Sequence, residues 1–374
     1  MANYSDDLNY YSDDNYIFDD DIYDYSDDVN CSNQSLPASY IYVPMLYFIF
    51  FFIGFVGNLF VILVIGSRGK MGSRLVDTFV VNLALADLVF VLTLPFWAIS
   101  ASQHGHWNFG DISCKLSSYI IAVNRFANIF FLTCMSVDRY LAVVRLMDSR
   151  FLRSKVCIHI TCAVIWLTSL VMGTPSLIYR KAKIFDDEPF CVDDDVSTLF
   201  LGLSLTTVFV TFALPVLIIL FCYGSVVARL RQPCAATSNP RAEARRRHSL
   251  KMVFTIIVFF MVSWLPFNIF KTISICFHLA KDEADLSCSQ SVVNQGLVLS
   301  SCLAFLNSCV NPAIYFFLDH HFKRKAKNLY LICIRRRGMH QGYNSSNSLT
   351  NNFTSESYGT SASRTRLQSL DRKL

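Results

Sequence analysis

Charged residues are scarce in this chain of 374 residues. Lysine, arginine, aspartate and glutamate together make up 16% of the sequence, whereas hydrophobic residues make up 53%. Soluble globular domains carry about 25% charged residues. The shortage of charge therefore excludes an ordinary soluble protein.

Patterns for catalysis and metal binding are also missing from the sequence. The 13 cysteines show no zinc-type spacing, and we find neither a nucleophile–base arrangement nor a phosphate-cradling loop. We therefore expect no enzyme activity and no cofactor other than a bound cation considered below. Nucleic acid is not an expected partner.

Long apolar stretches are abundant instead. A helix that crosses a bilayer needs about 20 apolar residues, and seven stretches meet this length: residues 41–66, 76–102, 115–144, 156–178, 198–229, 250–279 and 291–317. A basic, amphipathic segment follows at 319–333. The sequence predicts an all-α membrane protein, a seven-transmembrane-helix bundle with a short amphipathic eighth helix against membrane lipid.

Basic residues lie in alternate loops, which the positive-inside rule places in the cytoplasm. They are Arg68, Lys70, Arg74, Arg145, Arg150, Arg153, Lys155, Arg229, Arg231, Arg241, Arg245 to Arg247 and Lys323 to Lys325. We therefore expect a multi-pass plasma-membrane protein with residues 1–40 outside, a seven-helix domain at 41–318, the amphipathic helix at the inner membrane face, and a cytoplasmic Ser/Thr-rich tail at 334–374. Because residues 1–40 are polar and acidic, the first apolar stretch should act as the insertion signal.

The predicted outer surface is acidic. Of the 28 aspartates and glutamates, 20 fall on this side, ten of them before residue 40. Such a surface attracts cationic ligands, although acidic tails can also serve only to keep a segment soluble.

The N-terminal segment also carries modification patterns. Tyrosines beside aspartates are plausible sulfation sites, namely Tyr10, Tyr11, Tyr16, Tyr23 and Tyr25. Asn3, Asn30 and Asn33 each begin an Asn-x-Ser pattern for N-glycosylation. An acidic, disordered strip of this kind can wrap around a basic partner.

Four cysteines lie where an oxidising environment can pair them. We expect Cys114 to pair with Cys191, which pins the loop after the fourth crossing over the mouth of the bundle. Cys31 should pair with Cys288, with Cys276 as a competing partner. Cys333 follows the amphipathic segment and is a plausible palmitoylation site.

Polar side chains inside apolar stretches require a reason, because a charge at the bilayer centre costs about 2.5–3.5 kcal/mol on insertion scales. Asp87 lies in the middle of the second crossing. The polar residues that can surround it are Asn58, Asn124, Asn128, Asn307, Ser308 and Asn311. This set offers oxygen ligands to a sodium ion, or it forms a hydrogen-bonded network that only locks the helices together.

Two further features suggest a bundle that switches between states. Asp138 and Arg139 end the third crossing, where the aspartate can hold the guanidinium and later release it. Six prolines fall in six different apolar stretches and favour kinks there; they are Pro44, Pro95, Pro175, Pro215, Pro266 and Pro312.

Taken together, these residues resemble the rhodopsin-like (class A) G-protein-coupled receptors over about residues 40–335. The matching motifs are Gly57-Asn58, Leu83-Ala84-Leu85-Ala86-Asp87, Asp138-Arg139-Tyr140, Trp166, Pro215 with Tyr223, Phe260 with Trp264-Leu265-Pro266, and Asn311-Pro312-Ala313-Ile314-Tyr315. Within the family, the chemokine and chemoattractant peptide-receptor branch fits best. Its features are Thr93-Leu94-Pro95, Trp107-Asn108-Phe109-Gly110 and the Cys31–Cys288 pair, and residues 75–98 and 135–144 look similar to orphan receptors.

The resemblance implies a mechanism for these positions. Trp264 would be a toggle beneath the ligand, and Phe260 would pass on its motion. Arg139 would leave Asp138 and meet a heterotrimeric G protein of the inhibitory class, while Tyr223 and Tyr315 stabilise the open state. The family's activation positions in this chain are Asp138, Arg139, Tyr140, Tyr223, Phe260, Trp264, Pro266, Asn311, Pro312 and Tyr315. Serines and threonines between 345 and 369 would be targets of receptor kinases that recruit arrestin.

The outer half of the bundle indicates the ligand. Ile121 stands where an amine receptor carries aspartate, and Phe305 stands where an opsin carries lysine. The expected ligand-binding residues are Trp97, Ile121, Arg125, Arg180, Trp264 and Lys271. A cationic patch beneath an acidic rim suggests a basic peptide or chemokine-like protein whose acidic end reaches Arg125 or Lys271, unless Arg125 has a purely structural role.

Other functions remain as alternatives. A non-signalling scavenger of the same fold often alters the segment after Arg139, which is intact here. A receptor for a non-peptide ligand is a second alternative. A channel or transporter would carry a hydrophilic stripe along several helices, whereas only scattered polar residues occur here.

Overall fold

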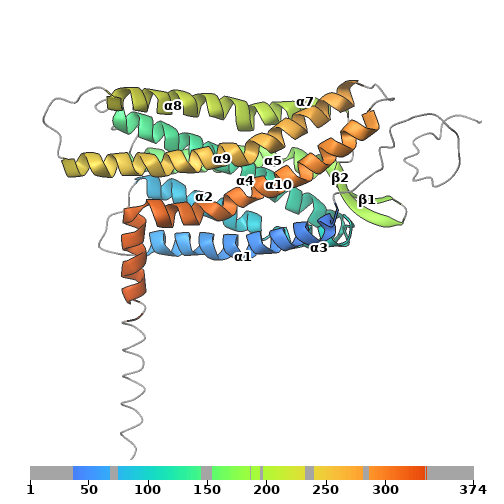
Figure 1. The fold of residues 1–374 in the computed structure, drawn as a ribbon, viewed down its shortest axis with the longest axis horizontal. Helices are drawn as coiled ribbons and strands as arrows, with labels where there is room; N and C mark the ends of the chain where they lie inside the picture. The colour runs from blue at the N-terminus through green and yellow to red at the C-terminus, as the bar shows by residue number, and fades with distance from the viewer. Residues whose placement is uncertain are drawn as a thin grey trace, which may run out of the picture.

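The computed structural model describes residues 37–67, 75–144, 154–185, 187–193, 197–231, 240–280, 286–332 and 334. Within these ranges, seven helical segments are long and apolar enough to cross a membrane: Ser39–Gly66, Leu75–Ser102, Gly110–Val143, Lys155–Tyr179, Thr198–Arg229, Leu250–Phe277 and Ser291–Leu318. Figure 1 shows them packed side by side as an elongated bundle. The predicted seven-helix membrane bundle is confirmed.

Several crossings consist of more than one helix. The elements are α1 (Ser39–Gly66), α2 (Leu75–Val91), α3 (Leu94–Ser102), α4 (Gly110–Val143), α5 (Lys155–Gly173), α6 (Pro175–Tyr179), α7 (Thr198–Val208), the π-helix η1 (Phe209–Ala213), α8 (Leu214–Arg231), α9 (Pro240–Ala280) and α10 (Leu286–Leu318). A further helix spans residues 320–332, and Figure 1 shows it turning away from α10 across the bundle. The expected eighth helix is therefore present.

Interruptions of the helices lie beside prolines, which lack the backbone N–H that continues a helix. Between α2 and α3, the Thr93 hydroxyl donates to the Phe90 carbonyl at 2.7 Å, and Pro95 lies in the first turn of α3. Pro175 begins α6, and η1 ends two residues before Pro215. Three of the six prolines that the sequence singled out therefore lie at helix breaks, whereas Pro44, Pro266 and Pro312 lie inside α1, α9 and α10.

A β-hairpin lies at one end of the bundle and projects beyond the helices (Figure 1). Strand β1 (Arg180–Phe185) pairs antiparallel with β2 (Glu188–Asp193), so that Arg180 lies opposite Asp193. The Trp107 backbone N–H donates to the Pro189 carbonyl at 2.6 Å and joins the hairpin to the loop between α3 and α4. We call this the hairpin end, and the end that carries helix 320–332 the opposite end.

Close packing of α1 on its neighbours requires a glycine at position 54. A Cβ atom there would lie 2.7 Å from Val91 Cγ1 and 3.2 Å from Cys309 Sγ, whereas a Cβ at Gly66 would meet nothing within 4 Å. Gly54→Ala should lower the melting temperature of the purified protein, because overpacking costs about 1–3 kcal/mol. Gly66→Ala is the matched control and should melt like the wild type. Equal melting temperatures for both variants would contradict this packing.

Candidate functional site

A cavity of about 840 Å³ lies at the hairpin end, between the helices and beneath the hairpin. The structure brings all six predicted ligand-binding side chains to its wall: Trp97, Ile121, Arg125, Arg180, Trp264 and Lys271. They come from α3, α4, β1 and α9. Residues separated by more than 170 positions therefore share one cavity.

The cavity wall is positively charged. Among its described lining residues, the arginines and lysine are Arg125, Arg180 and Lys271, against one carboxylate, Asp193. The guanidinium of Arg125 lies 5.6 Å from the centre of the Phe126 ring, and its Nε has no hydrogen-bond partner among the described residues. Lys271 interacts electrostatically with Asp193, Arg180 and Arg125, so these charges form one cluster.

The unsatisfied polar groups at the wall are donors. Among the described residues, the indole N–H groups of Trp97 and Trp264 and the Nε of Arg125 are buried without an acceptor. Buried donors without partners cost free energy. The cavity is therefore suited to a ligand that supplies acceptors, and a carboxylate supplies both acceptors and the missing negative charge.

Asp193 is a lining residue that the sequence analysis did not single out. Its Oδ1 lies 2.9 Å from Nε of Arg180, directly across the hairpin. Arg180 also donates from Nη1 to the Cys191 carbonyl at 3.0 Å. Asp193 stands two residues after Cys191, so the predicted disulfide could have placed it near the cavity mouth, whereas its side of strand β2 follows only from the structure.

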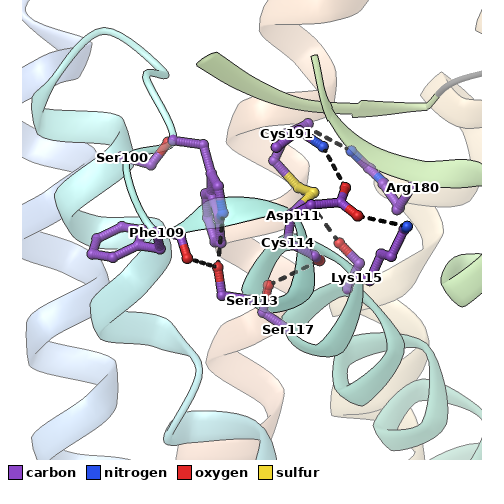
Figure 2. Close-up of a disulfide and its surroundings, with 12 residues drawn as sticks. Ser100, Phe109, Asp111, Ser113, Cys114, Lys115, Ser117, Arg180 and Cys191 are labelled. Carbon is purple, nitrogen blue, oxygen red and sulfur yellow. Dashed lines mark hydrogen bonds and ion pairs between the residues drawn. A yellow bond between two sulfur atoms is a disulfide. The ribbon is translucent and has the colours of Figure 1, made fainter. Parts of the chain in front are cut away.

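The predicted Cys114–Cys191 disulfide is confirmed, with Cα atoms 5.6 Å apart. Figure 2 shows it joining α4 to the hairpin, with Arg180 and Asp111 nearby. Asp111 forms an ion pair with Lys115 at 2.6 Å and accepts from the Ala182 backbone N–H at 3.0 Å. The disulfide and the hydrogen bond from Ala182 to Asp111 fix the hairpin to α4 at the cavity mouth.

The structure does not test the second predicted disulfide, between Cys31 and Cys288. Cys31 lies outside the described residues, as does the side chain of Cys288. Cys276, considered as a competing partner, is a free and exposed cysteine. The Cys31–Cys288 pair therefore stays a prediction.

Amide side chains from α4 and α10 surround Asp87. Its Oδ1 accepts from Asn124 at 3.0 Å and from Asn128 at 2.8 Å, and its Oδ2 accepts from Asn311 at 3.0 Å. Asn58 donates to the carbonyl of Ser308 at 2.9 Å. The network joins α1, α2, α4 and α10 through buried polar groups.

Some oxygen atoms around Asp87 could still accept a hydrogen bond or bind a cation. Among the described residues, the side-chain oxygens of Asn58, Asn128, Asn307 and Asn311 have no hydrogen-bond donor. Carboxylate and amide oxygens are ligands of small hard cations. The residues therefore fit a sodium ion held beside Asp87 as well as they fit ordered water. Among the described residues there is no cluster of three His, Cys, Asp or Glu for another metal.

At the opposite end, Arg139 Nη2 lies 2.8 Å from Oδ2 of the adjacent Asp138. Tyr223 of α8 interacts electrostatically with Arg139. The hydroxyls of Tyr223 and Tyr315 are buried without partners among the described residues. The Tyr140 ring lies 5.9 Å from that of Phe221. Arg139 and the two tyrosine hydroxyls thus lie near the ends of α4, α8 and α10.

Aromatic rings on α9 form a chain from the cavity wall towards the buried core. Trp264 lies at the cavity wall, with its ring 5.7 Å from Phe267 and 6.0 Å from Phe260. Pro266 lies inside α9 and Pro312 inside α10. The structure therefore places Trp264 between the cavity and the buried core.

The predicted modification sites lie outside the described residues. This applies to glycosylation at Asn3, Asn30 and Asn33, to sulfation at Tyr10, Tyr11, Tyr16, Tyr23 and Tyr25, and to palmitoylation at Cys333. They stay predictions.

The seven-helix bundle and its disulfide are those of a membrane receptor, and the chain belongs to the rhodopsin family. The model of that family, 7 transmembrane receptor (rhodopsin family), matches residues 57–315. This is a family of receptors and not of enzymes, as the sequence predicted.

Among curated proteins, the chain is similar to a probable G-protein coupled receptor 25 of Mus musculus, with 39% identity over 87% of each chain. It is 34% identical to G-protein coupled receptor 15 of Mus musculus, over 79% of this chain and 80% of the relative. It is 33% identical to type-1 angiotensin II receptor A of Xenopus laevis, over 87% and 90%. The predicted resemblance to orphan members of the family is confirmed.

Proposed function

We propose that this receptor binds an extracellular basic peptide or chemokine-like protein at its hairpin end and activates a heterotrimeric G protein at the opposite end. The hairpin end would be extracellular, with the N-terminus outside and the C-terminus in the cytoplasm. The distribution of basic residues supports this orientation, and a disulfide at the hairpin end is consistent with an oxidising compartment.

The observation that carries the proposal is the charge of the cavity. Three cationic side chains and one carboxylate line it, and Arg125 and Lys271 form no ion pair among the described residues. An acidic side chain or a free carboxyl terminus of the ligand would supply the missing charge. The basic body of the ligand would rest on the acidic, glycosylated and sulfated segment 1–40.

Signal transmission would follow the aromatic and polar contacts through the bundle. A ligand that displaces the Trp264 ring would move Phe260 and the α9 segment that contains Pro266. Arg139 would then leave Asp138 and bind the G protein, with the hydroxyls of Tyr223 and Tyr315, which have no partner among the described residues, stabilising the open arrangement. The inhibitory class of G protein suits the basic loops, and receptor kinases and arrestin would act on the Ser/Thr-rich tail.

Sodium is the cation that we propose for the Asp87 cluster. Asp87 and the side-chain oxygens of Asn124, Asn128, Asn307, Ser308 and Asn311 would hold it. A bound cation there would supply positive charge to a carboxylate that is otherwise buried among amides, and it would favour the packing in which α2, α4 and α10 converge.

Asp138→Asn should raise ligand-independent signalling about threefold or more, because removing one partner of a buried ion pair is strongly destabilising and the Asp138 carboxylate lies 2.8 Å from Nη2 of Arg139. The measurement is G-protein activation in cells at matched surface expression. Asp111→Asn is the control, since Asp111 also pairs with a cation but at the hairpin end. Unchanged basal signalling in Asp138→Asn would show that this ion pair does not restrain the receptor.

The proposal is tested by screening secreted basic peptides and chemokines against cells that express the receptor, with cyclic AMP and arrestin recruitment as readouts. We expect a peptide to lower cyclic AMP and recruit arrestin. Internalisation of a chemokine with neither response would favour a scavenger, which the intact Asp138–Arg139 pair argues against. Activation by an amine or a lipid alone would overturn the peptide assignment.

A further inference from the structure

One face of helix 320–332 packs against the bundle. Phe322 is buried, and Ala326 and Leu329 pack against the same core cluster. The Phe322 ring lies 5.9 Å from Phe60 of α1 and 6.4 Å from Tyr315 of α10. These positions recur at the spacing of a single helix face, so the helix is docked beside Tyr315 and not merely attached to the end of α10.

Lys325 lies in the middle of this packed face. Its side chain is 7% exposed, and its Nζ lies 3.1 Å from Oδ2 of Asp77, whose side chain is 2% exposed. Asp77 belongs to the first turn of α2, where the helix dipole favours a negative charge. The buried ammonium group of Lys325 therefore contacts the Asp77 carboxylate, which the α2 dipole stabilises. The two residues are 248 positions apart in the sequence.

An apolar residue would fill the position of Lys325 without the desolvation cost of a buried charge, so stability alone does not explain the pair. A buried ion pair does specify direction and register, since a rotated or shifted helix would take the buried ammonium group of Lys325 away from the Asp77 carboxylate. At this place in the fold, it fixes which face of helix 320–332 meets Tyr315.

We propose that Asp77 and Lys325 are positioning residues that hold helix 320–332 in its docked register beside Tyr315. Phe322 transmits this position to Tyr315 through the ring contact. The role of Tyr315 in signalling rests on the proposed function, whereas the docking of the helix by the ion pair does not. Loss of either charge would let the packed face open towards solvent.

The test measures how fast a thiol on the packed face is labelled. Ala326→Cys is introduced, and a membrane-impermeant maleimide is applied to the exposed opposite end of the full-length receptor in membranes. Labelling of the receptor without the added cysteine is subtracted. Asn328→Cys, on the exposed face, is the matched control.

We expect Lys325→Gln and Asp77→Asn each to accelerate labelling of Cys introduced at 326 by about 10-fold or more, since breaking a buried pair removes several kcal/mol of local stability. Lys325→Arg, which keeps the charge, should restore protection. Labelling of the control at 328 should stay constant. Two charge variants are used so that the test still works if one of them fails to reach the cell surface. The melting temperature of the bundle is recorded for each variant.

Protection at 326 that is unchanged in both charge variants would overturn the proposal. Rapid labelling in Lys325→Arg would do the same, because it would show a requirement for lysine packing and not for the ion pair. None of these outcomes depends on a ligand. Failure of the peptide screen would therefore leave this result standing, and failure here would leave the peptide assignment untouched.

Discussion

Replacing Arg125 by methionine is expected to weaken the potency of an activating peptide by about 100-fold, because truncating one partner of a buried charge pair costs about 2–5 kcal/mol. Methionine keeps much of the side-chain volume and removes the charge. Arg125 lines the cavity and has a free Nε among the described residues, so the ligand is the partner that would lose its contact. The concentration–response curve for arrestin recruitment is the measurement.

Two comparisons separate this effect from a loss of folding. Lys271→Met should also lower potency, because Lys271 belongs to the same charge cluster. Lys115→Met should not, since Lys115 pairs with Asp111 and does not line the cavity. If Arg125→Met keeps full potency at normal surface expression, Arg125 is structural and the acidic end of the ligand binds elsewhere.

Replacing Cys114 or Cys191 by serine is expected to remove most of the receptor from the cell surface. Loss of a native disulfide costs about 2–5 kcal/mol, and here it also releases the hairpin from α4 (Figure 2). Surface expression is measured with an antibody against an added N-terminal tag. The double variant should lie no lower than either single variant, because both remove the same bond.

Cys276→Ser provides the control for this experiment. Cys276 is free and exposed in the structure, so its replacement should leave surface expression unchanged. Normal surface expression of Cys114→Ser would contradict a structural role for the bond. A loss in Cys276→Ser would contradict its assignment as a free thiol.

The helices could be predicted because each crossing requires a continuous apolar stretch, and the interruptions could be predicted from prolines such as Pro95 and Pro175. The Cys114–Cys191 disulfide followed from placing both cysteines on one side of the membrane. In these cases, one physical constraint leaves its pattern in the sequence.

The hairpin could not be predicted in the same way. Strand β1 combines two lysines and an arginine with the exposed side chains of Ile184 and Phe185, so it has no alternation of apolar and polar residues. Its structure depends on contacts outside the strand, including the bond from Ala182 to Asp111 and the disulfide. Asp193 lies on this hairpin, so its position at the cavity wall could not be predicted either.

Ion pairs between elements that are far apart in the chain could not be predicted from the sequence either. In the sequence, Lys325 is one of several basic residues in a basic segment. Asp77 is a charged residue at the start of an apolar stretch. The two are joined only after α2 and helix 320–332 pack together. By contrast, the cluster around Asp87 could be anticipated, because a carboxylate inside a bilayer must be compensated by polar side chains on neighbouring helices.

The central claim is that the cationic cavity opens to the outside of the cell. The most direct measurement uses epitope tags at both ends of the chain and antibodies applied to intact and to permeabilised cells. The account predicts that the N-terminal tag is stained on intact cells, and that the C-terminal tag is stained only after permeabilisation. Staining of the C-terminal tag on intact cells, with the N-terminal tag protected, would place the cavity in the cytoplasm and contradict the proposed receptor for extracellular peptides.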